Sequence, residues 1–250
     1  MAAVVLGLMV VLGAPGRATA DPLDLLVVPD LVEIGAFFQG HQVTVSGKIP
    51  AGAEAVLEVM GQDAPEKLMR KGRRAGLWMN VGEVDISGAP SLYLVMSTKP
   101  ELLSGSENMR PWGYPALKKK IKFSGQVQDQ KRDVFVKQFL ELKESENLYA
   151  MLPRGLKAAA AGGDRRTVTG TFRLPANVKP ATYKVRLSAV QNGQVVTRQC
   201  TDLQVQMVGF PALLSSLAYE HGALYGILAV VLAIVTGFVM GYLFKGGGGH

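Results

Sequence analysis

The chain has 250 residues, of which 48% are hydrophobic and 19% charged, and its formal net charge is +7 at pH 7. A mean hydropathy of +0.18 excludes a disordered polypeptide and indicates that part of the apolar content serves a membrane. The single cysteine, Cys200, excludes an internal disulfide and a zinc site of paired cysteines. The length allows one large domain or two small ones.

The chain opens with an apolar run at residues 2–14, which is too short to span about 30 Å of hydrocarbon. Small residues follow at Ala18 and Ala20, the positions that a signal peptidase accepts. We therefore predict a cleaved signal peptide at residues 1–20. No Lys or Arg precedes the run, and a buried N-terminal strand or helix is the alternative interpretation.

Residues 21–103 carry short alternating runs that predict a first β-sandwich module. The expected strands are 32–38, 42–49, 55–60, 67–79 and 92–97. In the second of these strands Val43, Val45 and Ile49 share one face, which we expect to face the core. A linker containing Pro and Gly is expected at residues 104–115, between this module and the next.

Residues 116–210 are expected to form a second β-sandwich module. Alternation from Tyr183 to Ala189 leads into Asn192-Gly193, the sequence of a hairpin with a primed turn. Strands are also expected over residues 167–174 and around 203–207. The predicted fold is therefore mainly β, with two tandem immunoglobulin-like β-sandwich modules.

An amphipathic helix is predicted near residues 133–146, inserted in the second module. Apolar side chains recur there at i, i+4 and i+7, namely Phe135, Phe139 and Leu142. Glu141 and Glu144 fall on the opposite face. We therefore expect these carboxylates in solvent rather than converging in a cleft for acid–base catalysis.

Residues 223–244 carry no charge and, as a helix rising about 1.5 Å per residue, would cover about 33 Å. This length predicts a C-terminal transmembrane helix, with a juxtamembrane segment at 211–222 and a cytoplasmic tail at 245–250. Lys245 follows the span, and cations favour the cytoplasmic side. Together with the signal peptide, this topology places the body outside the cytoplasm.

Glycines are spaced for helix packing in this span. Gly237 and Gly241 form one Gly-x-x-x-Gly pair, and Gly222 with Gly226 forms another. We identify Gly226, Gly237 and Gly241 as candidate helix-packing residues toward a membrane partner. A coincidental spacing is the alternative, because Gly is common in transmembrane helices.

Two basic clusters stand out in the body, at residues 67–74 and 118–122. In the first, the candidate ligand-binding residues are Arg70, Lys71, Arg73 and Arg74, because guanidinium groups near a Gly turn can bind a small oxyanion. Lysines near a membrane can also attract anionic headgroups. A solvated edge that prevents sheet pairing is the alternative. Nucleic acid is not expected as a partner, because the cations are not interleaved with exposed aromatic residues.

Residues that could carry chemistry are sparse. The histidines, His41, His221 and His250, share no metal-ligand spacing, so we expect no metal and no cofactor. Cys200 is expected to be a buried small hydrophobe, and an exposed thiol that forms an intermolecular disulfide is the alternative. No catalytic constellation is evident, and we expect no enzyme activity.

Ordered sequence blocks also carry a family resemblance. They are Arg70-Lys71-Gly72-Arg73, Ala75-Gly76-Leu77-Trp78-Met79-Asn80, Pro90-Ser91-Leu92-Tyr93, Phe172-Arg173-Leu174-Pro175, Tyr183, Asn192-Gly193, Val208-Gly209-Phe210 and Leu224-Tyr225-Gly226. Together they closely resemble the alphaproteobacterial putative transmembrane protein family, from about residue 32 to the C-terminus. The resemblance implies an exported body with a C-terminal span, and a genomic association with permeases that look like sulfite or sulfonate exporters.

We therefore expect a non-enzymatic, single-pass protein of a bacterial inner membrane, with its body in the periplasm. The leading hypothesis is an accessory or interaction subunit of an inner-membrane complex, in which the partner is an anion exporter of the sulfite or sulfonate type. The alternative hypothesis is a periplasmic module that binds an oxyanion through the cluster at residues 70–74. The sequence assigns no oligomeric state.

Overall fold

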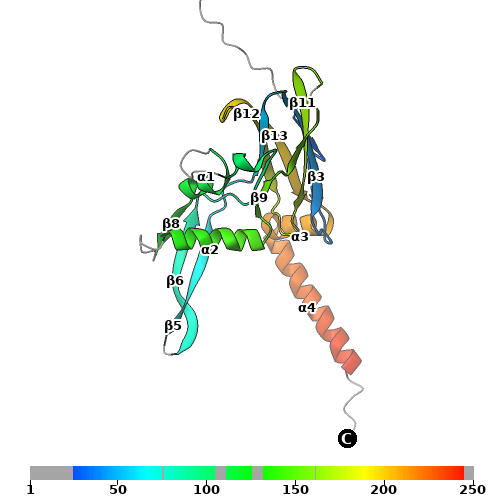
Figure 1. Cartoon of the computed structure of the whole chain (residues 1–250). Coiled ribbons are helices and arrows are strands. Elements are labelled where there is room, and N and C mark those ends of the chain that lie inside the picture. The colour runs from blue at the N-terminus through cyan, green and yellow to red at the C-terminus, as the bar shows by residue number, and fades with distance from the viewer. Residues whose placement is uncertain (1–24, 75, 105–110, 126–131, 161, 245–250) are drawn as a thin grey trace, which may run out of the picture.

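The computed structural model describes residues 25–74, 76–104, 111–125, 132–160 and 162–244. These residues form a β-rich body followed by two C-terminal helices (Figure 1). A mainly β fold with a C-terminal apolar helix is thereby confirmed. The signal peptide predicted at residues 1–20 and the tail predicted at 245–250 lie outside the described residues.

The first sheet has four strands in the order β1-β3-β11-β10, and every neighbouring pair is antiparallel. Its strands are β1 (Leu25–Val28), β3 (His41–Pro50), β10 (Leu156–Ala158) and β11 (Arg165–Leu174). In β3, Val43, Val45 and Ile49 are buried, which confirms the face predicted for the core. Thr44, Ser46 and Lys48, on the other face, remain at least partly exposed, as period-2 alternation requires.

The second sheet has six strands in the order β2-β13-β12-β4-β7-β9. Its strands are β2 (Leu31–Ile34), β4 (Glu54–Met60), β7 (Tyr93–Ser97), β9 (Tyr149–Pro153), β12 (Ala181–Gln191) and β13 (Gln194–Met207). The pairs β2–β13 and β7–β9 are parallel. The predicted hairpin is present between β12 and β13, where Asn192 (φ 51°) and Gly193 (φ 78°) both have the positive φ of a primed turn.

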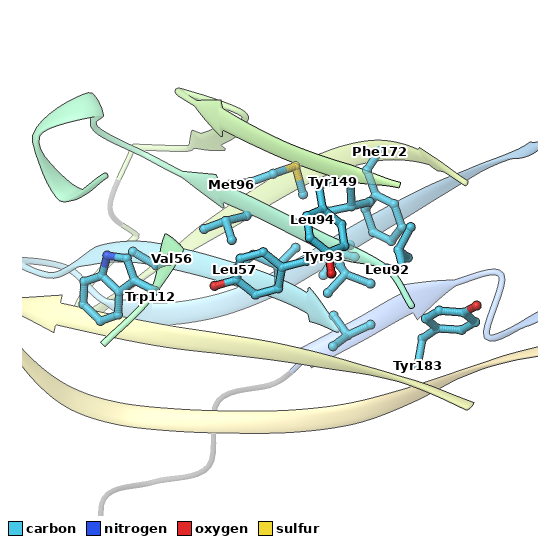
Figure 2. Close-up of a cluster of buried hydrophobic side chains, with 14 of the residues drawn as sticks. Val56, Leu57, Leu92, Tyr93, Leu94, Met96, Trp112, Tyr149, Phe172 and Tyr183 are labelled. Atoms are coloured by element: carbon cyan, nitrogen blue, oxygen red, sulfur yellow. The ribbon is translucent and has the colours of Figure 1, made fainter. Parts of the chain in front are cut away.

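The two sheets share one core, so the prediction of two separate tandem modules is wrong. Strand β3 pairs with β11 and β4 pairs with β12, which joins strands from both predicted modules. Figure 2 shows Leu57, Tyr149 and Phe172 gathered in this common core. Alternation defines which face of a strand is buried, but it does not define which strand covers that face.

The last residues of the predicted linker at 104–115 are packed against the body. Trp112 is 5% exposed, and its Nε1 donates a hydrogen bond to the carbonyl of Leu102 at 2.7 Å. Leu102 ends the short 3₁₀ helix η1 (Pro100–Leu102), and helix α1 (Gly113–Lys120) follows Trp112 directly. The predicted linker at 104–115 therefore ends in a buried anchor, because an indole in the core removes a large apolar area from water.

A third sheet has the order β5-β6-β8, with β5 (Glu66–Arg74), β6 (Leu77–Ser87) and β8 (Lys122–Gly125). The sequence predicts one strand over residues 67–79, whereas the chain turns at Gly76 (φ 85°) and forms two antiparallel strands. Alternation is retained on both sides of the turn, and Gly76 adopts its positive φ without steric cost because it has no Cβ.

Helix α2 (Arg132–Ser145) confirms the predicted amphipathic helix. Its buried residues are Val136, Phe139, Leu140 and Lys143. The predicted apolar position Leu142 is instead 38% exposed, because the buried stripe follows residues 136, 140 and 143. Glu141 and Glu144 are exposed, as expected.

The body continues through α3 (Gly209–Glu220), which covers most of the predicted juxtamembrane segment, into α4 (Gly222–Phe244). Helix α4 has 23 residues and a mean hydropathy of 2.5, and none of it is buried in the protein. By length and composition it is the one candidate membrane span among the described residues, and it coincides with the span predicted at 223–244.

Candidate functional site

The β5–β6 hairpin extends from the body on the same side as α4 (Figure 1). Its base is fixed by Val84 and Ile86, which are buried in the core. Among the described strands, β8 pairs with β6 only between Val84 and Ser87. The outer part of the hairpin is therefore a two-stranded ribbon that leaves the body.

The outer part of the hairpin carries large apolar side chains in solvent. Trp78 is 74% exposed and Leu77 is 68% exposed, and Met79 is also exposed. In the pairing register Trp78 lies opposite Arg73, and Met79 lies opposite Gly72. The sequence does not reveal this surface, because the pattern of residues 67–79 predicts one continuous strand.

The four predicted oxyanion-binding residues all belong to β5. The side chains of Arg70, Lys71 and Arg74 lie outside the described part of the structure, so their convergence on a ligand stays a prediction. Arg73 is exposed, and its Nε donates a hydrogen bond to the carbonyl of Gly76 at 3.3 Å. This contact places one guanidinium beside the turn of the hairpin.

A buried cation fastens the hairpin base to α2. Lys143 is 5% exposed, and its Nζ lies 2.7 Å from Oε1 of Glu66 and 3.1 Å from Oε2 of Glu146. The same ammonium lies 5.7 Å from the ring centroid of Phe139. Lys143 is not among the residues predicted to be functional, although a lysine four residues after Phe139 falls on the apolar stripe and signals a buried partner.

A second buried charge ties α1 to the six-stranded sheet. Glu58 is buried, and its Oε1 accepts a hydrogen bond from the hydroxyl of Tyr93 at 3.0 Å. The same hydroxyl accepts one from the backbone N–H of Gly113 at 2.9 Å, and Arg186 lies 3.6 Å from Glu58. Burial raises the pKa of Glu58, although the Tyr93 hydroxyl and the charge of Arg186 oppose that shift. Burial, together with the charge of Glu58, raises the pKa of Tyr93.

Lys143 and Glu58 are both paired with charged or polar side chains inside the body. In the part of the chain that the structure describes, no group of three or more His, Cys, Asp and Glu residues could hold a metal ion. The predicted burial of Cys200 is wrong, because its thiol is exposed. Pairing runs without a bulge from Cys200 to Leu203, so Cys200 stays on the face opposite the buried Leu203.

The candidate helix-packing residues all lie on α4. An added Cβ at Gly226, Gly237 or Gly241 would meet no heavy atom within 4 Å, beyond the neighbours and backbone of the helix itself. At the first turns of α4 a shallow groove of about 420 Å³ is lined by Gly222, Ala223, Gly226, Ile227, Val230 and Val231. The glycines therefore leave open space beside the helix.

The fold and these surfaces define a β-rich membrane protein with one candidate C-terminal span. A family model described as Putative transmembrane protein (Alph_Pro_TM) matches residues 23–246, which is most of the chain. The chain belongs to this family, and the resemblance recognised in its sequence blocks is confirmed. No curated protein matches the sequence.

Proposed function

We propose that this protein is a non-enzymatic interaction subunit of a bacterial inner membrane, which associates with another membrane protein through α4. In this proposal the body lies in the periplasm and the signal peptide expected at residues 1–20 directs its export. An anion exporter of the sulfite or sulfonate type is the partner that the family resemblance suggests. The proposal depends mainly on the glycine surface of α4.

The two glycine pairs of α4 lie on one face of the helix. Gly226 and Gly237 are eleven residues apart, which is three turns plus about 20° in a helix of 3.6 residues per turn. Gly222 and Gly241 extend the same stripe at both ends. In lipid, helices associate by close packing at small residues, because lipid tails are as apolar as the side chains they would replace. A continuous stripe of this kind favours a partner helix.

The body supports an interaction role through its strand order. We infer an immunoglobulin-like sandwich in which β1-β3-β11-β10 corresponds to the A-B-E-D sheet. In the other sheet β13-β12-β4-β7 corresponds to G-F-C-C′ of a variable-type domain. Domains of this architecture present their end loops to partners, which fits a binding protein better than an enzyme.

Co-purification tests the proposal. The full chain is extracted in mild detergent, and proteins that accompany it are identified by mass spectrometry. We expect a membrane protein to co-purify with the native chain and to be lost in a Gly226→Ile and Gly237→Ile double variant. The control is Val235→Phe, because Val235 lies nine residues from Gly226 and therefore on the opposite face. A native chain that is strictly monomeric in mild detergent would contradict the proposal.

The alternative, an oxyanion-binding module, has the exposed Arg73 beside Gly76 in its favour. Titration calorimetry with sulfite, sulfate and phosphate tests it on the full chain in detergent. Binding heat that disappears in Arg73→Gln would support this alternative. The absence of heat with all three anions would exclude it.

A further inference from the structure

We propose that the outer part of the β5–β6 hairpin inserts into the headgroup region of the bilayer that α4 spans. The inserting surface, called here the hairpin tip, comprises Gly72, Arg73, Leu77, Trp78 and Met79. This role differs from the partner association proposed for α4. It gives the protein a second contact with lipid, through the body.

The strand directions place the hairpin and α4 at the same end of the body. Strands β4 and β13 each pair antiparallel with β12, so they run in the same direction. β4 ends at Met60, ahead of the hairpin, and β13 ends at Met207, ahead of α3 and α4. Figure 1 shows the hairpin and α4 extending on that side. A bilayer around α4 therefore lies on the side toward which the hairpin points.

The apolar residues of the hairpin tip lie on both faces of the ribbon. Leu77 and Met79 alternate with Trp78 along β6, so one face carries the indole and the other carries two aliphatic side chains. All three are exposed. An isolated two-stranded ribbon is only marginally stable in water, and apolar side chains on both of its faces add to the cost. A flat protein surface would cover one face, whereas lipid surrounds both.

Acidic and basic residues lie in different parts of the hairpin. Glu83 and Asp85, near the base, lie 2.8 Å and 3.6 Å from the ammonium of Lys67. Residues 68–82 contain four Lys or Arg and no Asp or Glu. The end nearest the membrane is therefore cationic and complements anionic lipid headgroups. Trp is also the residue most typical of the membrane interface, where its ring is apolar and its N–H can bond to water or phosphate.

The fluorescence of Trp78 tests the insertion in the full chain. The protein has two tryptophans, and Trp112→Phe leaves Trp78 as the single tryptophan, which is excited selectively over the tyrosines. The variant is reconstituted in vesicles of phosphatidylcholine and phosphatidylglycerol, with or without lipids brominated near the headgroup. We expect bromine to quench Trp78 and acrylamide to quench it weakly. Strong quenching by acrylamide without quenching by bromine would overturn the proposal.

A second measurement avoids any folding defect of the Trp112→Phe variant. In a Cys200→Ser background, a polarity-sensitive fluorophore is attached to Asn80→Cys beside the tip or to Gln194→Cys as the control. Both positions are exposed, and Gln194 begins β13 at the opposite end of the body. We expect a blue shift in vesicles at position 80 only. Equal emission at the two positions would overturn the proposal.

The same samples also test whether anionic lipid strengthens the insertion and whether lipid or another protein covers the hairpin tip. Arg73→Gln is expected to reduce the blue shift in vesicles containing phosphatidylglycerol, because one cation near an anionic surface changes local binding about fivefold. The effect should be absent in pure phosphatidylcholine. If the fluorophore at position 80 is shielded from both acrylamide and brominated lipid, a protein covers the tip, and the lipid proposal is wrong.

Discussion

The ammonium of Lys143 lies 2.7 Å from Oε1 of Glu66, although 77 residues separate the two in the chain. Glu66 begins β5 and Lys143 lies in the last turn of α2, so the ion pair connects the hairpin base to the helix. Lys143 is almost fully buried, and its ammonium lies 5.7 Å from the ring centroid of Phe139. A buried cation with this environment is stable only while its acidic partners remain in place.

We predict that Lys143→Met loosens the hairpin base. The substitution keeps the apolar stem but removes the charge. The free energy of unfolding should fall by less than the value of about 3–5 kcal/mol that is typical when a fully buried ion pair is broken, because the Glu66 side chain is 23% exposed. Hydrogen exchange of the full chain in detergent should accelerate at the paired residues of β5 and β6 near Glu66.

Lys137→Met is the matched control for this prediction. Lys137 lies in the same helix, 3.8 Å from Glu141, with 77% of its side chain exposed. An exposed i,i+4 pair contributes about 0.3–0.5 kcal/mol, so exchange in the hairpin should not change. Equal exchange rates in the two variants would show that the Lys143 pair does not hold the hairpin.

The second prediction concerns pH and Glu58. Its pKa is raised above the ordinary value of 4.5, so the folded protein binds more protons than the unfolded chain just above that pH. Stability contributed by this group is therefore largest at low pH and falls as pH rises from about 4.5 through the raised pKa. Glu58→Gln should remove this fall, which is measured as the melting temperature across a pH series.

The melting temperature of the native chain alone does not isolate Glu58, because Glu54 also changes stability with pH. The effect of Glu58 is therefore the difference between the native chain and Glu58→Gln. Burial tends to raise the pKa of Glu54, but hydrogen bonds from Thr98 and Lys99 and the charge of Arg166 outweigh it and lower the pKa. Its contribution is present above about pH 4.5 and is lost as pH falls, which is the opposite sign. Parallel pH profiles for the native chain and Glu58→Gln would contradict the role given to Glu58.

A third prediction tests topology through Cys200. This residue is the single cysteine and its thiol is exposed, so it reports which side of the membrane the body occupies. A maleimide that cannot cross membranes should label the chain in intact spheroplasts. Cys200→Ser should abolish labelling. Labelling that occurs only after lysis would place the body in the cytoplasm and contradict the proposed orientation.

A fourth prediction concerns the close approach of Gly88 to α1. Gly88 has φ 72°, and an added Cβ would lie 2.4 Å from the carbonyl oxygen of Lys120. Gly88→Ala should therefore lower the free energy of unfolding by more than the value of about 1–2 kcal/mol that a non-glycine residue loses in a left-handed conformation alone. The control is Gly193→Ala, which has φ 78° and no atom within 4 Å of the added Cβ. Equal losses of melting temperature in the two variants would contradict the clash at Lys120.

Local pattern was sufficient for several elements of this protein. The alternation around Val43 and the Asn192-Gly193 turn are defined by residues a few positions apart, and the structure contains both as expected. The uncharged run that forms α4 is equally local. By contrast, the turn at Gly76 was missed because alternation continues on both sides of it. The exposed Trp78 was missed for the same reason.

The sequence by itself determined the type of each major element and the presence of a C-terminal apolar helix, because side-chain periodicity and hydropathy are properties of neighbouring residues. Only the tertiary structure decided that β3 pairs with β11 and that Lys143 meets Glu66. Those contacts join distant segments, and their selection depends on which apolar faces and charges cover one another when the whole chain packs. The same long-range packing merged two expected modules into one core and left the hairpin tip outside it.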